Sequence, residues 1–305
     1  MHRIKFGAIL GIALLLMVNS VAAQLKEIPS IKTDVYELYA PNEKELKTAA
    51  EELDFAAKNF EKYFGEAPPK IAVYVLNSPN EISKIDFRSF SSRGLKVLPF
   101  ISTDYLKSLK KPDDKKIGLA EARALSHEAG HKYLITWADT KTKRAPGMVR
   151  KYGHPSMPDW FDEAFATLCE YPFLQKRRYA FLEKNMDKTI PFEEFLKMDH
   201  PMLSKLSGGK QMSKTDMEKI LKNLPAGAKI TVRKGDDLVT EKDYMFYSQS
   251  LAITDFLVEK KGATIIKQIA EGLLADKNLA EIISGDSDIS KLESDWKTWL
   301  KARKN

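Results

Sequence analysis

The stretch SHEAGHKYL, residues 126–134, constrains the fold most, because it places two histidines four positions apart with a glutamate after the first. The surrounding residues 117–137 are rich in Ala and Leu without an internal Pro, which predicts a helix. On a helix, His127 and His131 project from one face and can bind the same Zn²⁺ ion, with Glu128 beside that face. The alternative is a partly exposed helix with two unrelated histidines. A third protein ligand elsewhere would decide between them.

A second motif lies at residues 158–171, PDWFDEAFATLCEY. Together with HEAGH, it resembles the gluzincin metallopeptidases, most closely the small peptidase MA-like families. Their second motif reads approximately P-x-W-L-x-E-G-x-A, with a further Glu seven residues beyond the first. The matching residues are Pro158, Trp160, Glu163, Ala166 and Glu170. Two positions differ, because Phe161 stands where Leu is usual and Ala164 replaces the usual Gly.

The resemblance implies Glu163 as the third metal ligand. A carboxylate on a second helix would complete a His₂Glu zinc site and leave the fourth position for water. Glu170 follows two turns later and could accept the second ring N–H of a ligating histidine, a role for which Asp162 is a weaker candidate. A surface acid is the alternative for Glu163, and an exposed acid or a salt bridge is the alternative for Glu170. Gly130, between the histidines, would provide room for the metal.

Periodicity predicts several elements outside the two motifs. Residues 41–64 show helical spacing that Gly65 can end, and 71–76 form a buried strand. Residues 95–101 predict a strand at a sheet edge, because Pro99 cannot donate to a ladder. A capping box at Ser78–Glu81 predicts the start of a short helix. A basic loop at 138–157 precedes a helix that Ser156 and Pro158 start and Pro172 stops. From Asp243 onward, the chain is predicted to form helices with a break at Gly262.

These elements and the resemblance together predict an α+β, zincin-like fold for residues 28–303. We expect a small mixed sheet with the active-site helix in an upper lobe and a mainly α-helical lower lobe. The resemblance covers most of residues 40–303. Residues 203–240 are rich in lysine and look like an insertion, in which the stretch AKITVRKGDDLV favours a small hairpin.

The N-terminus predicts export. Arg3 and Lys5 precede an almost wholly apolar run at 6–18, and small residues follow, so residues 1–23 read as a signal peptide cleaved after Ala23. We therefore expect a periplasmic or secreted protein without a stable membrane span. The single cysteine, Cys169, excludes an internal disulfide and predicts helix packing. The net charge of +7 is spread among many acids, so a nucleic-acid partner is not expected.

The function that the resemblance implies is zinc-dependent hydrolysis of a peptide bond in a peptide or protein substrate. Glu128 would be the general base, and Tyr247 would donate to the oxyanion, with Tyr244 as the near alternative. The edge strand at 95–101 would pair with an extended substrate. Two other functions stay open: a non-catalytic metal-bearing envelope factor, and a zinc hydrolase acting on a non-peptide amide or on cell-wall peptides. His154 and His200 are expected to be surface histidines.

Overall fold

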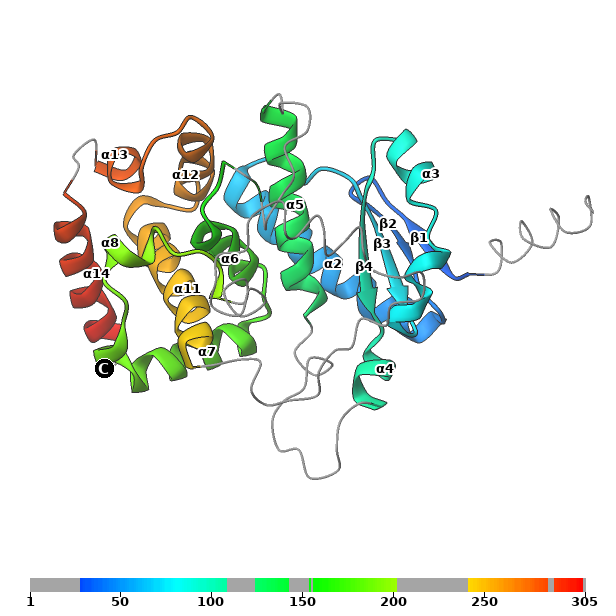
Figure 1. Ribbon diagram of the computed structural model, residues 1–305, viewed down its shortest axis with the longest axis horizontal. Coiled ribbons are helices and arrows are strands. Elements are labelled where there is room, and N and C mark those ends of the chain that lie inside the picture. Colours follow the sequence, from blue (N-terminus) through cyan, green and yellow to red (C-terminus); the bar gives the residue numbers. More distant parts are fainter. Residues whose placement is uncertain are drawn as a thin grey trace, which may run out of the picture.

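The computed structural model describes residues 28–108, 124–142, 154, 156–201, 241–284 and 288–303. The predicted signal peptide, residues 117–123 of the predicted helix, most of the basic loop and the predicted insertion at 203–240 lie outside the described residues. The described chain combines one small four-stranded sheet with many helices (Figure 1). The predicted α+β class is confirmed in this coarse form.

The sheet has the strand order β1-β2-β3-β4, with strands at Ser30–Lys32, Tyr36–Tyr39, Ile71–Leu76 and Lys96–Ile101. β1 pairs antiparallel with β2, and the other two pairs are parallel. Among the described residues β4 is an edge strand, where Pro99 stands opposite Tyr74 of β3. Both predicted strands are therefore confirmed, and so is the edge position that the missing N–H of proline favours.

The long first helix, α2, spans Glu43–Phe64. The Asn42 side chain caps it by accepting the backbone N–H of Glu45, and Gly65 ends it in the left-handed conformation with φ of 67°. Its apolar face packs on the sheet and on α5, the helix of the first histidine motif. The predicted helix is confirmed, although it begins at Glu43 rather than at Pro41.

The predicted capping box is wrong in its details. Residues Pro79–Lys84 form a 3₁₀ helix, and the Ser78 side chain makes no capping hydrogen bond. The Glu81 carboxylate instead accepts the backbone N–H of Asn77 and pairs with Lys84. The backbone N–H of Ser78 also interacts with this carboxylate, so the glutamate half of the capping box is present and only the serine half is missing.

Four helices carry the residues of the two motifs and their surroundings. α5 spans Leu125–Lys141, α6 Asp159–Leu168, α7 Pro172–Lys184 and α11 Glu241–Lys261. The remaining helices are α3 (Phe87–Ser92), α4 (Thr103–Ser108), α8 (Phe192–Phe195), α12 (Ile265–Leu274), α13 (Leu279–Ser284) and α14 (Ile289–Arg303). α5 continues four residues beyond the predicted end at Trp137. The start of α6 after Pro158 and the break at Gly262, with φ of 86°, are as predicted.

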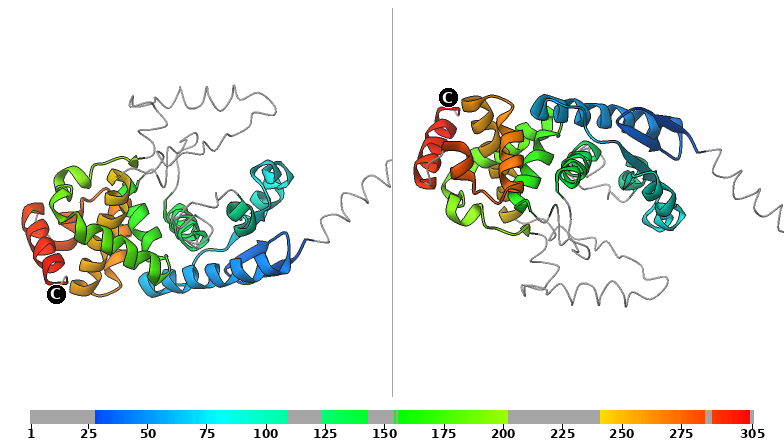
Figure 2. Two further views of the ribbon diagram at one scale, coloured as in Figure 1. Left: turned by 90° about the horizontal axis from the view of Figure 1, so that it is seen from below. Right: turned by 90° about the horizontal axis from the view of Figure 1, so that it is seen from above.

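The α5–α6 pair lies between two halves of the molecule. The sheet, α3, α4 and the start of α2 lie on one side, and α7, α8 and α11 to α14 gather on the other (Figures 1 and 2). The long α2 runs from the sheet past α5, so that it also contacts α12. α6 packs against both α5 and α11, and one hydrophobic core runs from β2 through these helices to α14. The two histidines of α5 therefore face a junction between the halves. None of the described helices is long and apolar enough to cross a membrane.

Candidate metal centre

The start of α5 is held by an acid from α2. The backbone N–H of Ser126 donates to the Glu52 carboxylate over 3.1 Å, and both residues are buried. The first N–H groups of a helix lack partners inside the helix, so a buried helix start needs such an acceptor. This contact fixes the end of α5 from which His127 and His131 project.

Close packing of α5 on α6 depends on a glycine. A Cβ atom at Gly130 would lie 3.0 Å from the Cα of Ala166 and 3.0 Å from the Cβ of Cys169. Gly130 therefore lets the two helices approach each other, and the sequence-based view that it makes room for a metal ion is wrong. Cys169 is fully buried, as predicted, and burial raises the pKa of its thiol.

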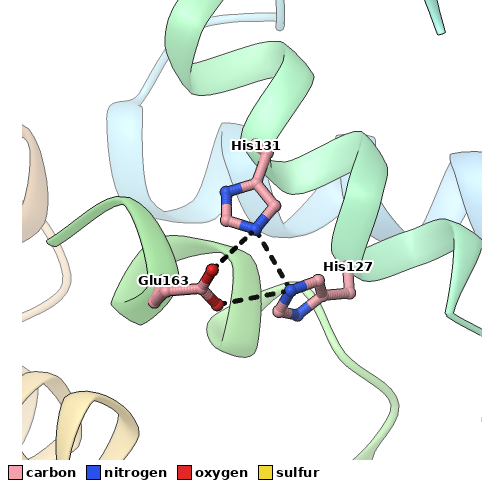
Figure 3. A group of neighbouring side chains, drawn as sticks. All are labelled: His127, His131 and Glu163. Atoms are coloured by element: carbon pink, nitrogen blue, oxygen red, sulfur yellow. Dashed lines mark hydrogen bonds and ion pairs between the residues drawn. The ribbon is translucent and has the colours of Figure 1, made fainter. Parts of the chain in front are cut away.

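This packing brings three ligand-type atoms together (Figure 3). His127 Nε2 lies 3.1 Å from His131 Nε2, and each nitrogen lies 3.4 Å from one carboxylate oxygen of Glu163. Ligand atoms about 2.0–2.1 Å from a tetrahedral ion lie roughly 3.3 Å apart. His127, His131 and Glu163 therefore form a cluster that could hold a metal ion. Glu163 is 1% exposed, so the structure does not place it as a surface acid.

The second ring nitrogen of each histidine faces an acid of α6 or its end. His127 Nδ1 lies 2.9 Å from Glu170 Oε1, and His131 Nδ1 lies 3.0 Å from Asp162 Oδ1. These are the two acids that the sequence suggested for this role. A carboxylate beside Nδ1 favours a proton there and leaves Nε2 to face the centre.

The charges at the cluster are strongly coupled. Burial lowers the pKa of His127, but Glu163 and Glu170 outweigh burial and raise it to about 9. The pKa of His131 is likewise raised, against burial, by Asp162 and Glu163. Burial raises the pKa of Glu163, yet the surrounding histidines bring it well below its usual range. The centre therefore favours positive charge, whether carried by protons or by a cation.

Tyr247 of α11 lies at the same junction. Its hydroxyl is 3.1 Å from His200 Nε2, and its ring centroid is 6.3 Å from that of His127. Burial, and then the negative charge of Glu163, raise the pKa of this phenol, so the hydroxyl keeps its proton at neutral pH. Tyr244 is 47% exposed, with its ring beside Phe181 of α7. The structure thus places Tyr247, and not Tyr244, at the cluster.

Glu128 is exposed and directly follows His127 on α5. Its carboxylate is near enough to Tyr247 that its charge contributes to the raised pKa of the phenol. Glu128 and Tyr247 therefore interact electrostatically, although they come from helices far apart in the sequence.

The prediction that His154 and His200 are surface histidines is wrong. Each is 2% exposed. His200 Nε2 lies 3.0 Å from Glu163 Oε1, and the His200 backbone N–H donates to Asp159 at the start of α6. His154 Nε2 lies 3.5 Å from an Asp139 oxygen on α5. Neighbouring prolines suggested exposed loops, but contacts with distant elements bury both rings.

Sequence reasoning also missed Arg178 of α7, which pairs with Glu170. Burial raises the pKa of Glu170, but the Arg178 charge and the contacts with Arg178 and His127 lower it to about 2. Arg178 belongs to the run Lys176-Arg177-Arg178, which is typical of a solvated face. For His200, one signal existed: the chain has only five histidines, and three of them meet at this cluster.

The chain matches no protein-family model, and no curated protein matches it. The case for a function therefore rests on the residues and their geometry.

Proposed function

We propose that this protein is an exported zinc-dependent metallopeptidase of gluzincin type. The observation that carries the proposal is the convergence of His127 and His131 with Glu163 from a second helix, at spacings that fit a single ion. Two imidazoles and one carboxylate suit zinc and leave a fourth position open. The His₂Glu set is shared by several zinc peptidases with this helix motif.

The arrangement of the two halves supports a zincin-like fold in the same proposal. The sheet half would form the upper lobe, the helical half the lower lobe, and the α5–α6 pair the floor between them. β4 lies against α5 and is an edge strand of the described sheet. An extended peptide that pairs with β4 would pass near the cluster.

Zinc bound at the cluster would supply an activated water and a Lewis acid for the scissile carbonyl. Glu128 would take the proton from the attacking water and pass it to the leaving amine. Tyr247, which stays protonated, would donate a hydrogen bond to the developing oxyanion. Glu170 and Asp162 would hold the two histidine rings with their Nε2 atoms toward the ion.

A digest of a peptide library tests this function. The wild-type chain should cleave peptides, lose the activity with a zinc chelator and regain it with added zinc. Glu128→Gln should keep the metal and lose the activity, because it removes the base without removing a ligand. Glu61→Gln is the matched control, since Glu61 is an exposed acid near the end of α2.

Two results of this experiment would replace the proposal. Stoichiometric zinc without cleavage of any peptide would favour a metal-bearing binding or assembly factor of the cell envelope. Cleavage of cell-wall peptides or of a non-peptide amide, but not of the library, would move the substrate to that class.

A further inference from the structure

Arg178 lies outside both motifs, yet its guanidinium reaches the metal cluster. It belongs to α7, and its side chain is 17% exposed. Its Nε atom donates to Glu170 Oε2 over 2.6 Å, and its Nη2 atom donates to Glu170 Oε1. This two-point contact fixes the plane of the carboxylate, which a single-point contact with a lysine would not do.

Glu170 passes this orientation on to a candidate ligand. The oxygen that accepts from Arg178 Nη2, Oε1, is also the one that lies 2.9 Å from His127 Nδ1. Arg178, Glu170 and His127 therefore form one continuous row. A rotation of the Glu170 carboxylate would remove the acceptor beside the His127 ring.

The same guanidinium also lies over the ring of Tyr247. Its central carbon is 4.8 Å from the ring centroid, the range of a cation–π contact. Tyr247 belongs to α11, so Arg178 contacts two separate helices besides its own. His200 also joins the two sides, from Glu163 to the Tyr247 hydroxyl, whereas Arg178 joins Tyr247 to the partner of His127.

We propose that Arg178 is a positioning residue that couples the two sides of the site: it holds His127 through Glu170 and holds the Tyr247 hydroxyl through the ring. The inference rests on the proposed function. It predicts that one substitution at Arg178 weakens zinc binding, through the contact with Glu170, and lowers turnover, through the contact with the Tyr247 ring.

The first test compares Arg178→Met with Arg177→Met. Arg177 is the exposed neighbour on the same helix, so the control removes the same charge from the same turn. Competition with a chromogenic chelator should show zinc binding about 10–100-fold weaker in Arg178→Met than in the control. The visible spectrum of the cobalt-substituted protein should also change, which a loss of global stability alone would not produce. Equal zinc affinities and equal cobalt spectra in the two folded variants would overturn the proposal.

The second test isolates the tyrosine and uses Arg178→Lys, which keeps the charge but loses the planar fork. With zinc saturating, this change should lower kcat at least about tenfold on a peptide selected from the library. In the Tyr247→Phe background, the same change should lower kcat far less, because the hydroxyl that it misplaces is absent. Equal losses in both backgrounds would overturn the coupling. If Arg178→Met does not fold, the comparison with Arg178→Lys still tests whether Arg178 positions Tyr247.

The controls separate this inference from the function on which it rests. A wild-type chain that binds no zinc and cleaves no peptide would remove the proposed function and this inference with it. Normal binding and turnover in the wild type, with Arg178 variants that behave like Arg177→Met, would overturn the inference alone.

Discussion

The buried acids of the sheet half and those around the α5–α6 pair meet different partners. Glu45 accepts the backbone N–H groups of Thr103 and Asp104 at the start of α4, and Glu52 accepts that of Ser126 at the start of α5. Glu37 pairs with the Arg93 guanidinium. We call these three the structural acids. Each has hydrogen-bond donors that stabilise its charge without any added ion.

The acids around the α5–α6 pair, which we call the centre acids, all face imidazole rings, and Glu170 pairs with Arg178 as well. They are Asp162, Glu163 and Glu170. An imidazole offers a positive charge only when it is protonated, and a metal ion can take the place of that proton. Burial of an acid is therefore no sign of function by itself. Its partners separate an acid that caps a helix from one suited to a metal centre.

The largest difference between the two sets should appear on removal of one acid from each. Glu163→Ala should lose zinc and peptidase activity together, because only two protein ligands remain. Glu45→Ala, which uncaps α4 instead, should keep both and lose about 1–2 kcal/mol of unfolding free energy, as on loss of a helix cap. Metal analysis and urea unfolding measure these outcomes. Wild-type zinc affinity in Glu163→Ala would show that another residue is the third ligand.

The two tyrosines of α11 extend the comparison to the hydroxyl at the centre. Tyr247→Phe should lower kcat and kcat/KM alike by about 10²–10³, because the donor acts in the transition state. KM and zinc content should change little. Tyr244→Phe should leave kcat near the wild-type value, since that ring is exposed and lies beside Phe181. Steady-state kinetics on one library peptide checks both. A reversed result would assign the hydroxyl to Tyr244.

The smallest effect concerns the pH dependence of a structural acid. Burial raises the pKa of Glu37, but hydrogen bonds from Arg93 and Tyr39 outweigh burial and lower it. A lowered pKa in the folded state stabilises the protein above the unfolded value of 4.5, and this contribution is lost as the pH falls through the folded pKa. Glu37→Gln should therefore be less stable at pH 6, by up to about 1 kcal/mol.

Urea unfolding of the wild type and Glu37→Gln at pH 6 and pH 3 measures this difference, which should shrink at the lower pH. A difference that stays constant between the two pH values would show that the charge of Glu37 contributes nothing to folding.

The sequence predicted the elements that follow from local periodicity and the acids that follow from helical spacing. The helix that ends at Gly65 and the edge strand with Pro99 both depend on residues close together in the chain. Likewise, Glu170 lies two turns beyond Glu163, so its approach to a histidine could be expected. In each of these cases, local backbone geometry determines the outcome.

Contacts between distant elements could not be predicted in this way. Arg178 meets Tyr247 across 69 positions of sequence, and His200 is buried by contacts with α6 and α11. Nothing near either residue distinguishes it from a surface residue. The role of Gly130 was misread for the same reason, since its neighbours Ala166 and Cys169 lie on α6 and directly after it. Spacing along one helix predicts which side chains share a face, whereas tertiary packing decides what that face meets.

The central claim is that His127, His131 and Glu163 bind one zinc ion, and zinc X-ray absorption on the purified protein tests it most directly. We predict one zinc per chain, with two imidazole nitrogens at about 2.0–2.1 Å and oxygen ligands completing the coordination. A chain without stoichiometric zinc, or a zinc ion whose ligands include no imidazole, would contradict the account.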